Sequence, residues 1–210
     1  MSHEENQFRV ALDSALKDFG LEPLSEKQSN QLIGHYSMLQ RWNRRTNLTR
    51  IIEPREAARF HYAESLLGAR FINGARSLLD IGSGAGFPAV PIAIARPDVE
   101  VVALEANQKK SLFLNEAKDE LGLGNFKVAT ARLESFDLSR FGLLASRALD
   151  RAEELLPSVV GQLGERQRLM LYCSPDLVSK LERAVNARIK VETHSIPQAA
   201  SRIIAIFSRD

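Results

Sequence analysis

The stretch from Ser77 to Pro88 constrains the fold of this chain more than any other. Its first five residues, Ser-Leu-Leu-Asp-Ile, have the short apolar composition of a strand, and the next seven read Gly-Ser-Gly-Ala-Gly-Phe-Pro. Glycine accepts positive φ and carries no Cβ, so three glycines at alternate positions let the backbone turn sharply against a ligand. A strand that contains an acid near its end, Asp80, and then turns through such a loop is typical of the first strand of a parallel α/β sheet.

Beyond Ser77 the sequence alternates between short apolar runs and amphipathic segments. The runs predict strands at residues 77–81, 100–105, 126–130, 142–146, 168–173, 188–194 and 202–208. Helices are expected between them at residues 88–95, 108–121, 151–163 and 176–186. Five strands that alternate with four helices, followed by two adjacent strands, predict a seven-stranded, mostly parallel α/β sheet that is closed by an antiparallel last hairpin.

The first 70 residues carry helical signals only. Apolar residues at helical spacing predict one helix over residues 5–19, and Ser25 with Gln28 matches a capping box that would start a second. We therefore expect an N-terminal helical extension over residues 1–70, packed on the core, and a Rossmann-like domain over residues 71–210.

Composition limits the class of protein. Cys173 is the only cysteine, which excludes an intrachain disulfide. The spacing of His3, His35 and His194 is not that of metal ligands, so we expect no metal site. The first residues lack the blocks of a signal peptide, and the apolar runs are too short to span a bilayer. We expect a cytoplasmic monomer without a membrane segment. The formal net charge of +2 identifies no partner, but residues 41–59 hold six arginines against two glutamates.

The glycine loop favours a cofactor without phosphate. A dinucleotide site usually has the spacing G-x-G-x-x-G and places the N–H groups of the next helix under a pyrophosphate. Here the spacing is G-x-G-x-G, and Pro88 and Pro91 remove up to two of those donors. A ligand without phosphate therefore fits better, and S-adenosylmethionine (AdoMet) is the obvious one. Glu105 at the end of the next predicted strand is placed to accept the ribose hydroxyls of an adenosine. The alternative is a glycine turn with a solvated acid beyond it.

Six ordered motifs occur between about Leu32 and Phe207. They read Trp42-Asn43-x-x-x-Asn47-Leu48-Thr49, His61-x-x-Glu64-Ser65, Asp80-Ile-Gly-Ser-Gly-Ala-Gly-Phe-Pro88, Lys109-Lys110 with Phe113-Leu114, Ala131-Arg132-Leu133-Glu134, and Ser146-Arg147-Ala148. Together they resemble the RsmG (GidB) family of bacterial rRNA methyltransferases, which methylate N7 of a guanine in 16S rRNA with AdoMet. The resemblance implies a Rossmann-like, AdoMet-dependent methyltransferase fold with an N-terminal helical extension.

The same resemblance implies a set of site residues. The AdoMet pocket would be formed by Asp80, Gly82, Gly84, Gly86, Phe87, Glu105, Leu133, Glu134 and Arg147. The catalytic residues would be Arg147, where methyl donor and base meet, and Arg202 in the last strand. RNA contacts would come from Arg41, Asn43, Arg44, Arg45, Asn47, His61 and Arg132. The partner would be 16S rRNA or the small ribosomal subunit.

This chain departs from the family pattern at three places. Glu64 stands where members usually have Asp, and Ala89 follows the proline where Gly is usual. The fifth predicted strand ends in the run Leu171 to Pro175, Leu-Tyr-Cys-Ser-Pro, where members typically carry Lys-Gly. By the resemblance, the missing lysine would remove a cation directed at RNA.

The expected reaction needs neither a general base nor a nucleophile from the protein. Guanine N7 has an exposed lone pair and no proton to remove, so methyl transfer needs no general base, and much of the acceleration can come from positioning. Attack on carbon 5 of a pyrimidine would need a cysteine nucleophile, for which Cys173 is the sole candidate. The Asn/Asp-Pro-Pro-aromatic motif of exocyclic-amine methyltransferases is absent. We expect Arg147 to orient the guanine through its fixed fork of donors.

Each assignment has an alternative. Arg147 could pair with Asp150 or Glu153 as an ordinary surface arginine. The arginine cluster around Trp42 fits RNA phosphates and an unstacked base, but charge runs are usually solvated faces and Trp42 could be core. A structural role is open for His61. For the whole chain, the alternatives are a methyltransferase that acts on a small molecule or protein, and an RNA-binding or ribosome-assembly protein without activity.

Overall fold

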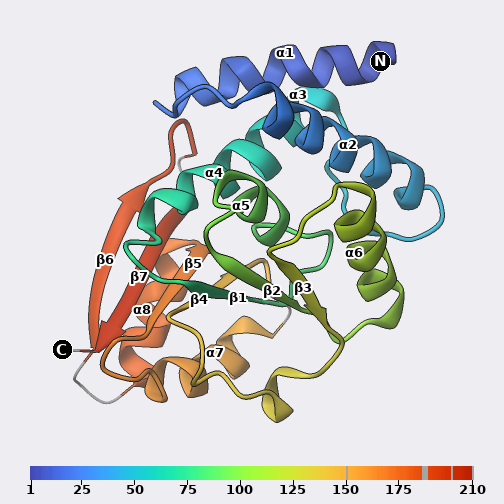
Figure 1. Ribbon diagram of the computed structural model, residues 1–210. Coiled ribbons are helices and arrows are strands. Elements are labelled where there is room, and N and C mark those ends of the chain that lie inside the picture. The colour runs from blue at the N-terminus through green and yellow to red at the C-terminus, as the bar shows by residue number, and fades with distance from the viewer. Residues whose placement is uncertain (150, 186–188, 200, 210) are drawn as a thin grey trace.

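The computed structural model describes residues 1–149, 151–185, 189–199 and 201–209. Within this part of the chain, seven strands form one sheet (Figure 1). The strands are β1 (Ser77–Ile81), β2 (Glu100–Leu104), β3 (Phe126–Ala129), β4 (Leu143–Arg147), β5 (Arg168–Cys173), β6 (Ile189–Ser195) and β7 (Ile203–Arg209).

The sheet has the order β3-β2-β1-β4-β5-β7-β6. The first five strands run parallel, whereas β7 is antiparallel to β5 and β6 is antiparallel to β7. The predicted mostly parallel sheet with an antiparallel last hairpin is therefore confirmed. Strand ends differ from the predicted ones by one residue at most, and residue 188, the predicted start of β6, lies outside the described residues.

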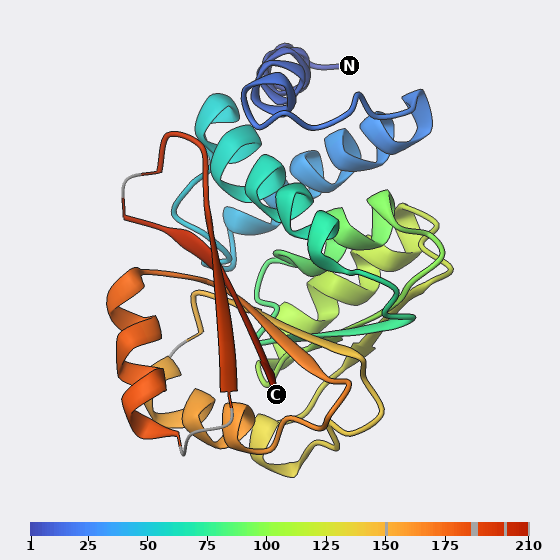
Figure 2. The ribbon, with the colours of Figure 1, turned by 90° about the vertical axis from the view of Figure 1, so that its left-hand side faces the viewer.

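The helices cover both faces of the sheet. They are α1 (His3–Asp18), α2 (Glu26–Asn43), α3 (Pro54–Glu56), the π-helix η1 (Ala57–Ala63), α4 (Glu64–Gly68), the 3₁₀-helices η2 (Ala69–Phe71) and η3 (Leu133–Ser135), α5 (Ala89–Ala95), α6 (Gln108–Glu120), α7 (Ala152–Gly161) and α8 (Pro175–Ala184). Figures 1 and 2 show α4, α5 and α6 on one face, with α1 and α2 stacked above them, and α7 and α8 on the other.

The second N-terminal helix starts where the sequence predicts it, whereas the first begins at His3, two residues before the predicted start. Ser25 Oγ accepts from Gln28 N at 3.3 Å and Gln28 Oε1 accepts from Ser25 N at 3.0 Å, which is the predicted capping box. The apolar stripes of both helices then enter the same buried cluster as the sheet, since Phe8, Leu32 and Leu78 are each 0% exposed in one core. The N-terminal helices are thus packed against the layer that covers β1.

Residues 54–68 form a helical segment that contains a wider turn. Between the short helix α3 and α4, the π-helix η1 includes a bond in which Glu64 N donates to Arg59 O, five residues back. π-helical turns are rare and occur frequently at functional sites. The segment lies beside the carboxyl ends of the strands, because Tyr172 Oη at the end of β5 donates to Ser65 O at 3.1 Å.

Candidate functional site

A cavity of about 370 Å³ lies at the carboxyl ends of β1, β2 and β4. Sheet register brings these ends together, since Ile81 is paired with Leu104 of β2 and with Ser146 of β4. Seven of the nine residues predicted for the AdoMet pocket line the cavity, namely Gly82, Gly84, Phe87, Glu105, Leu133, Glu134 and Arg147. The other two, Asp80 and Gly86, belong to the glycine loop and the strand beneath it.

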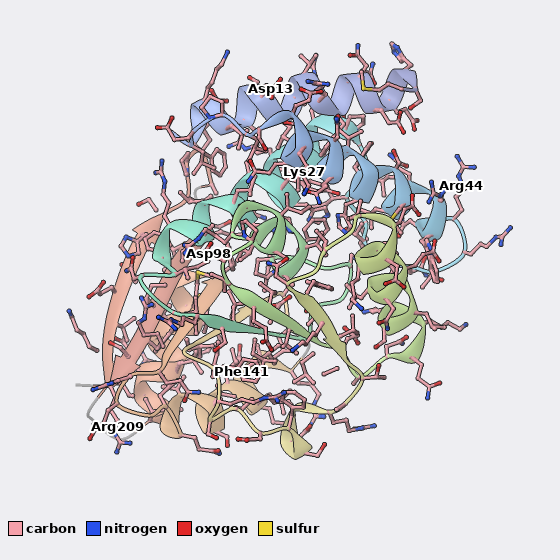
Figure 3. All side chains as sticks on the ribbon, in the orientation of Figure 1. Asp13, Lys27, Arg44, Asp98, Phe141 and Arg209 are labelled. Atoms are coloured by element: carbon pink, nitrogen blue, oxygen red, sulfur yellow. The ribbon has the colours of Figure 1, made fainter. Side chains whose placement is uncertain are left out.

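A larger cavity, of about 860 Å³, lies on the α7 face of the sheet. Phe141, which Figure 3 labels below the sheet, lines it together with Gly142 and Gln167. The last two precede β4 and β5, so this cavity reaches the amino ends of the strands. Ligands of open α/β sheets bind beyond the carboxyl ends, and we therefore place the candidate site in the smaller cavity.

The glycines of the loop serve different purposes. Gly84 has φ +56° and lines the cavity, and a Cβ added there would meet no atom closer than 3.8 Å. Gly86 has φ +86° and faces the core, where an added Cβ would lie 2.7 Å from Val90 Cγ2 and 3.2 Å from Leu114 Cδ2. Gly84 thus leaves ligand space open, whereas Gly86 lets the loop pack against the helix layer.

Glu105 holds the loop to the tip of β2. Its Oε2 accepts from Gly84 N at 2.8 Å, and its Oε1 accepts from Asn107 N at 2.8 Å. An ionised carboxylate has about four acceptor positions, so two remain for a ligand. The sequence placed the acid at this strand tip, but no pattern in it indicated the part that Asn107 plays.

Asp80 is fully buried beneath the loop. Ser83 Oγ donates to Asp80 Oδ2 at 2.5 Å, while Oδ1 has no hydrogen-bond partner within the described residues. Burial raises the pKa of Asp80 to about 7. The backbone N–H of Ala89 also acts to lower this pKa, but Oδ1 itself accepts no hydrogen bond within the described residues.

Arg147 lies at the end of β4 and enters the wall of the cavity. Its Nη1 donates to His61 O at 3.4 Å, and its Nη2 lies 3.4 Å from Glu64 Oε2. Arg202 donates from Nη2 to Glu64 Oε1 at 2.5 Å. The two arginines predicted as catalytic are thus brought together by one carboxylate.

The expected alternative for Arg147 was an ion pair with an acid near it in the sequence. Glu153 instead pairs with Lys180 at 2.7 Å, and Asp150 lies outside the described residues. The arginine side chain is 11% exposed. The structure therefore describes Arg147 as a nearly buried cation in the cavity wall.

His61 and His35 lie in an aromatic cluster beneath the cavity. The His61 ring stacks on Phe87 with centroids 4.4 Å apart, and its Nε2 lies 2.9 Å from Thr49 Oγ1. His35 Nδ1 lies 2.8 Å from Tyr62 Oη. Burial is the main cause that lowers the pKa of each histidine to about 3. Both rings are therefore neutral near pH 7 and suited to packing rather than proton transfer.

The residues predicted to contact RNA fall into two groups. Arg41 pairs with Glu120 at 3.1 Å, and Asn43 holds its own loop by accepting from Leu48 N and donating to Thr49 O. Arg44, Arg45, Asn47 and Arg132 are exposed, as is the paired Arg41. Figure 3 shows Arg44 extending away from the ribbon where α2 ends. Of the predicted set, Arg132 and His61 line the cavity.

Trp42 is half-buried between these groups. Its ring meets Phe113 edge-on at 5.7 Å, and its Nε1 donates to Glu116 at 3.1 Å. Thr49, which positions His61, belongs to the same motif, but its spacing in the sequence did not predict that contact. Leu149, which also lines the cavity, has no sequence signal that could have found it.

Two further groups bear on the chemistry. Cys173 is buried, and burial raises the pKa of its thiol to about 11, so it is protonated near pH 7. Among the described residues, no group of three or more His, Cys, Asp or Glu side chains is arranged to hold a metal ion. Within the same residues, no helix has both the length and the apolar character that crossing a membrane requires.

The chain has clear relatives. Residues 28–199 match the family model GidB, described as rRNA small subunit methyltransferase G. This chain belongs to that family. Ribosomal RNA small subunit methyltransferase G of Halorhodospira halophila is 32% identical over 195 residues, which cover 92% of each chain. The protein of the same name from Neisseria gonorrhoeae is 38% identical over 125 residues, which span 60% of each chain.

Solved structures agree with the family at the level of fold. A SAM-dependent O-methyltransferase from Thermotoga maritima superposes with a TM-score of 0.57 at 14% identity, covering 83% of this chain and 71% of that one. The expected Rossmann-like methyltransferase fold and the resemblance to the RsmG (GidB) family are thus confirmed.

Proposed function

We propose that this protein transfers a methyl group from AdoMet to N7 of a guanine in 16S rRNA. The observation that carries the proposal is the cavity at the strand ends, in which Glu105 and Arg147 line one space of about 370 Å³. Membership of a family named for methylation of small-subunit rRNA gives the substrate class. We further propose that the protein acts in the cytoplasm as a monomer and without a metal.

The donor set in and beneath the cavity fits AdoMet. Glu105 lines the cavity and retains two acceptor positions, which suit the two hydroxyls of a ribose. Asp80 Oδ1 lacks a partner and could accept, directly or through water, from a cationic amino group. Pro88 and Pro91 lack N–H groups at the start of α5, so the site offers little to a pyrophosphate. We therefore assign Asp80, Gly82, Gly84, Phe87, Glu105, Leu133 and Glu134 to the cofactor.

The reaction can proceed without a protein base or nucleophile. When bound, AdoMet would supply an electrophilic methyl group on its sulfonium. Guanine N7 has a free lone pair, so no side chain has to remove a proton. The neutral His61 and the protonated Cys173 agree with this requirement, because neither is prepared for proton abstraction or attack near pH 7.

What this chain's residues contribute is orientation. Arg147 enters the cavity wall as a nearly buried cation whose remaining donors can bond O6 of a guanine and a neighbouring phosphate, which leaves the N7 lone pair free to attack the methyl group. Because the guanidinium is planar and always charged, it fixes the base in one plane. His61 and Phe87 stack on each other and form a rigid apolar wall beside it. Preorganisation of this kind supplies rate by positioning alone.

RNA contact is proposed for the exposed cations near the cavity. Arg44 and Arg45 follow α2, and Arg132 is an exposed residue of the cavity rim. Cations in such positions neutralise phosphates and release counterions. We assign the sequence-specific step to the cavity and the salt-dependent affinity to these arginines.

One experiment tests the proposal. The protein is incubated with methyl-labelled AdoMet and either protein-free 16S rRNA, small ribosomal subunits, or a pool of small metabolites and proteins. Label in 16S rRNA that maps to N7-methylguanine supports the proposal. Label only in the metabolite or protein pool would instead identify a methyltransferase of another substrate class. AdoMet binding without label transfer to any substrate would favour an RNA-binding or assembly protein.

A further inference from the structure

We infer that Glu64 is a positioning residue that holds Arg147 and Arg202 together as one oriented cationic pair facing the RNA substrate. This inference rests on the proposed function, because it assigns the pair to the nucleotide that is methylated. Neither the cavity nor the glycine loop contains Glu64, which lies behind them at the start of α4. Its carboxylate is 1% exposed.

The carboxylate connects two strands that are not neighbours in the sheet. Arg147 ends β4, Arg202 precedes β7, and β5 runs between them. Glu64 spans this gap by placing Oε1 2.5 Å from Arg202 Nη2 and Oε2 3.4 Å from Arg147 Nη2. At the middle strand, Tyr172 Oη donates to Ser65 O at 3.1 Å, so α4 begins beside the end of β5.

The charges of this trio do not balance. Two guanidinium groups against one carboxylate leave one net positive charge. Burial raises the pKa of Glu64, and Arg147 followed by Arg202 act in the opposite direction by favouring the ionised form. Burying an ionised carboxylate costs free energy unless cations compensate it, so the buried Glu64 needs both Arg147 and Arg202. The surplus charge is available to an anionic or electron-rich group of a substrate.

The two arginines face different parts of the approach to the site. Arg147 lines the cavity and is 11% exposed, whereas Arg202 is 35% exposed and lies over the Phe60 ring at 4.8 Å from its centroid. A base that enters the cavity would meet Arg147, and the phosphate next to it would meet Arg202. Glu64 therefore sets the spacing between a base contact and a backbone contact.

Orientation depends on Glu64 because few other bonds hold Arg147. Apart from its ion pair with Glu64 at 3.4 Å, the Arg147 guanidinium is held within the described residues by one hydrogen bond, from Nη1 to His61 O at 3.4 Å. A long side chain that loses such a partner regains rotamer freedom that binding must then remove. The π-helical turn before Glu64 strengthens the case, since it sets the rotation between His61 and Glu64.

The test replaces the carboxylate by an amide of the same shape. Glu64→Gln adds one positive charge, so electrostatics alone would leave RNA affinity unchanged or improve it. If Glu64 orients the pair, kcat for RNA methylation falls by about 10-fold or more while the Kd for AdoMet stays within about 3-fold. Glu64→Asp, which retains the charge but is one methylene shorter, should recover part of kcat.

A matched control separates positioning from packing. Tyr172→Phe removes the bond to Ser65 at the same end of α4 without a change of charge. Thermal unfolding of each variant shows how much of it is folded at the assay temperature. We expect kcat of Tyr172→Phe to stay near wild type. Equal losses in Tyr172→Phe and Glu64→Gln, or an undiminished kcat in Glu64→Gln, would overturn the inference.

A second readout does not need activity. Arginine side-chain Nε–Hε signals in ¹⁵N NMR, assigned by Arg147→Lys and Arg202→Lys, should be sharp in the wild type and in Tyr172→Phe and should broaden or shift to the free-arginine position in Glu64→Gln. Unchanged signals in Glu64→Gln would contradict the positioning role. A wild type that binds AdoMet but never methylates RNA defeats the proposed function, and the same spectra still decide whether Glu64 orders the pair.

Discussion

Replacing Gly86 by alanine is expected to destabilise the protein more than replacing Gly84, although both glycines have positive φ. An L-residue in left-handed backbone costs about 1–2 kcal/mol, and this cost applies at both positions. At Gly84 an added Cβ meets nothing closer than 3.8 Å, so we expect a loss of about 1 kcal/mol. At Gly86 the Cβ would come within 2.7 Å of Val90 Cγ2, in fully buried surroundings.

The contact with Val90 adds a steric cost at Gly86 to the backbone cost of positive φ. Overpacking a buried site costs about 1–3 kcal/mol, which brings the expected loss for Gly86→Ala to about 3 kcal/mol. Urea unfolding measures the difference between the two variants. With a slope near 3 kcal/mol per molar, a gap of about 2 kcal/mol separates their midpoints by about 0.7 M.

The two substitutions should affect AdoMet affinity in the opposite order to stability. The methyl group added at Gly84 would lie in the cavity, so Gly84→Ala should weaken AdoMet binding by calorimetry more than Gly86→Ala does. Gly20 is a suitable control, because it has φ +61°, has no atom within 4 Å of an added Cβ, and lies at the end of α1. Gly20→Ala should cost about 1 kcal/mol and leave AdoMet binding unchanged. Equal destabilisation by Gly84→Ala and Gly86→Ala would refute the reasoning.

Four further outcomes are expected. The pKa of His35 is about 3 in the folded protein, against an ordinary value near 6.5 when unfolded, so its stabilising effect is present above pH 6.5 and is lost as the pH falls toward 3. His35→Leu should therefore flatten the pH dependence of the unfolding free energy by about 1.4 kcal/mol per unit between pH 6 and 4, and urea titrations that give identical slopes would contradict this. Glu105→Gln should weaken AdoMet binding by about 10-fold or more in calorimetry, since charged hydrogen bonds are lost; an unchanged Kd would exclude the ribose role. Arg147→Ala should abolish most methyl transfer but leave AdoMet binding intact, and full transfer would remove Arg147 from the mechanism. Charge reversal at Arg44 and Arg45 should weaken RNA binding and flatten its salt dependence, whereas an unaltered salt slope in a filter-binding assay would mean that these arginines do not meet phosphates.

Local patterns in the sequence were enough to predict the sheet and the position of the ligand loop. Short apolar runs mark the strands, and parallel strands bring their carboxyl ends to one edge, so the sequence alone places Glu105 beside the glycines. The structure puts its Oε2 2.8 Å from Gly84 N. Capping residues likewise predicted the start of α2, because a cap is a contact within one turn.

Contacts between distant segments were not predictable in this way. Glu64 meets Arg147 and Arg202, which lie far away in the sequence, and nothing near any of the three specifies the pairing. The sequence instead suggested neighbours of Arg147 as its partners. Asn43 illustrates the same limit, since its amide holds Leu48 and Thr49 within its own loop, and RNA contact at this position remains a prediction.

The π-helical turn of η1 also limits which insertions and deletions this segment tolerates. A residue added to or removed from an α-helix rotates everything beyond it by about 100°. A one-residue deletion between Ala57 and Ala63 could restore an ordinary helix at little cost to folding, but it would turn His61 away from Phe87 or Glu64 away from its two arginines. Natural variation in this stretch should therefore consist of substitutions, with insertions and deletions confined to the loops on either side.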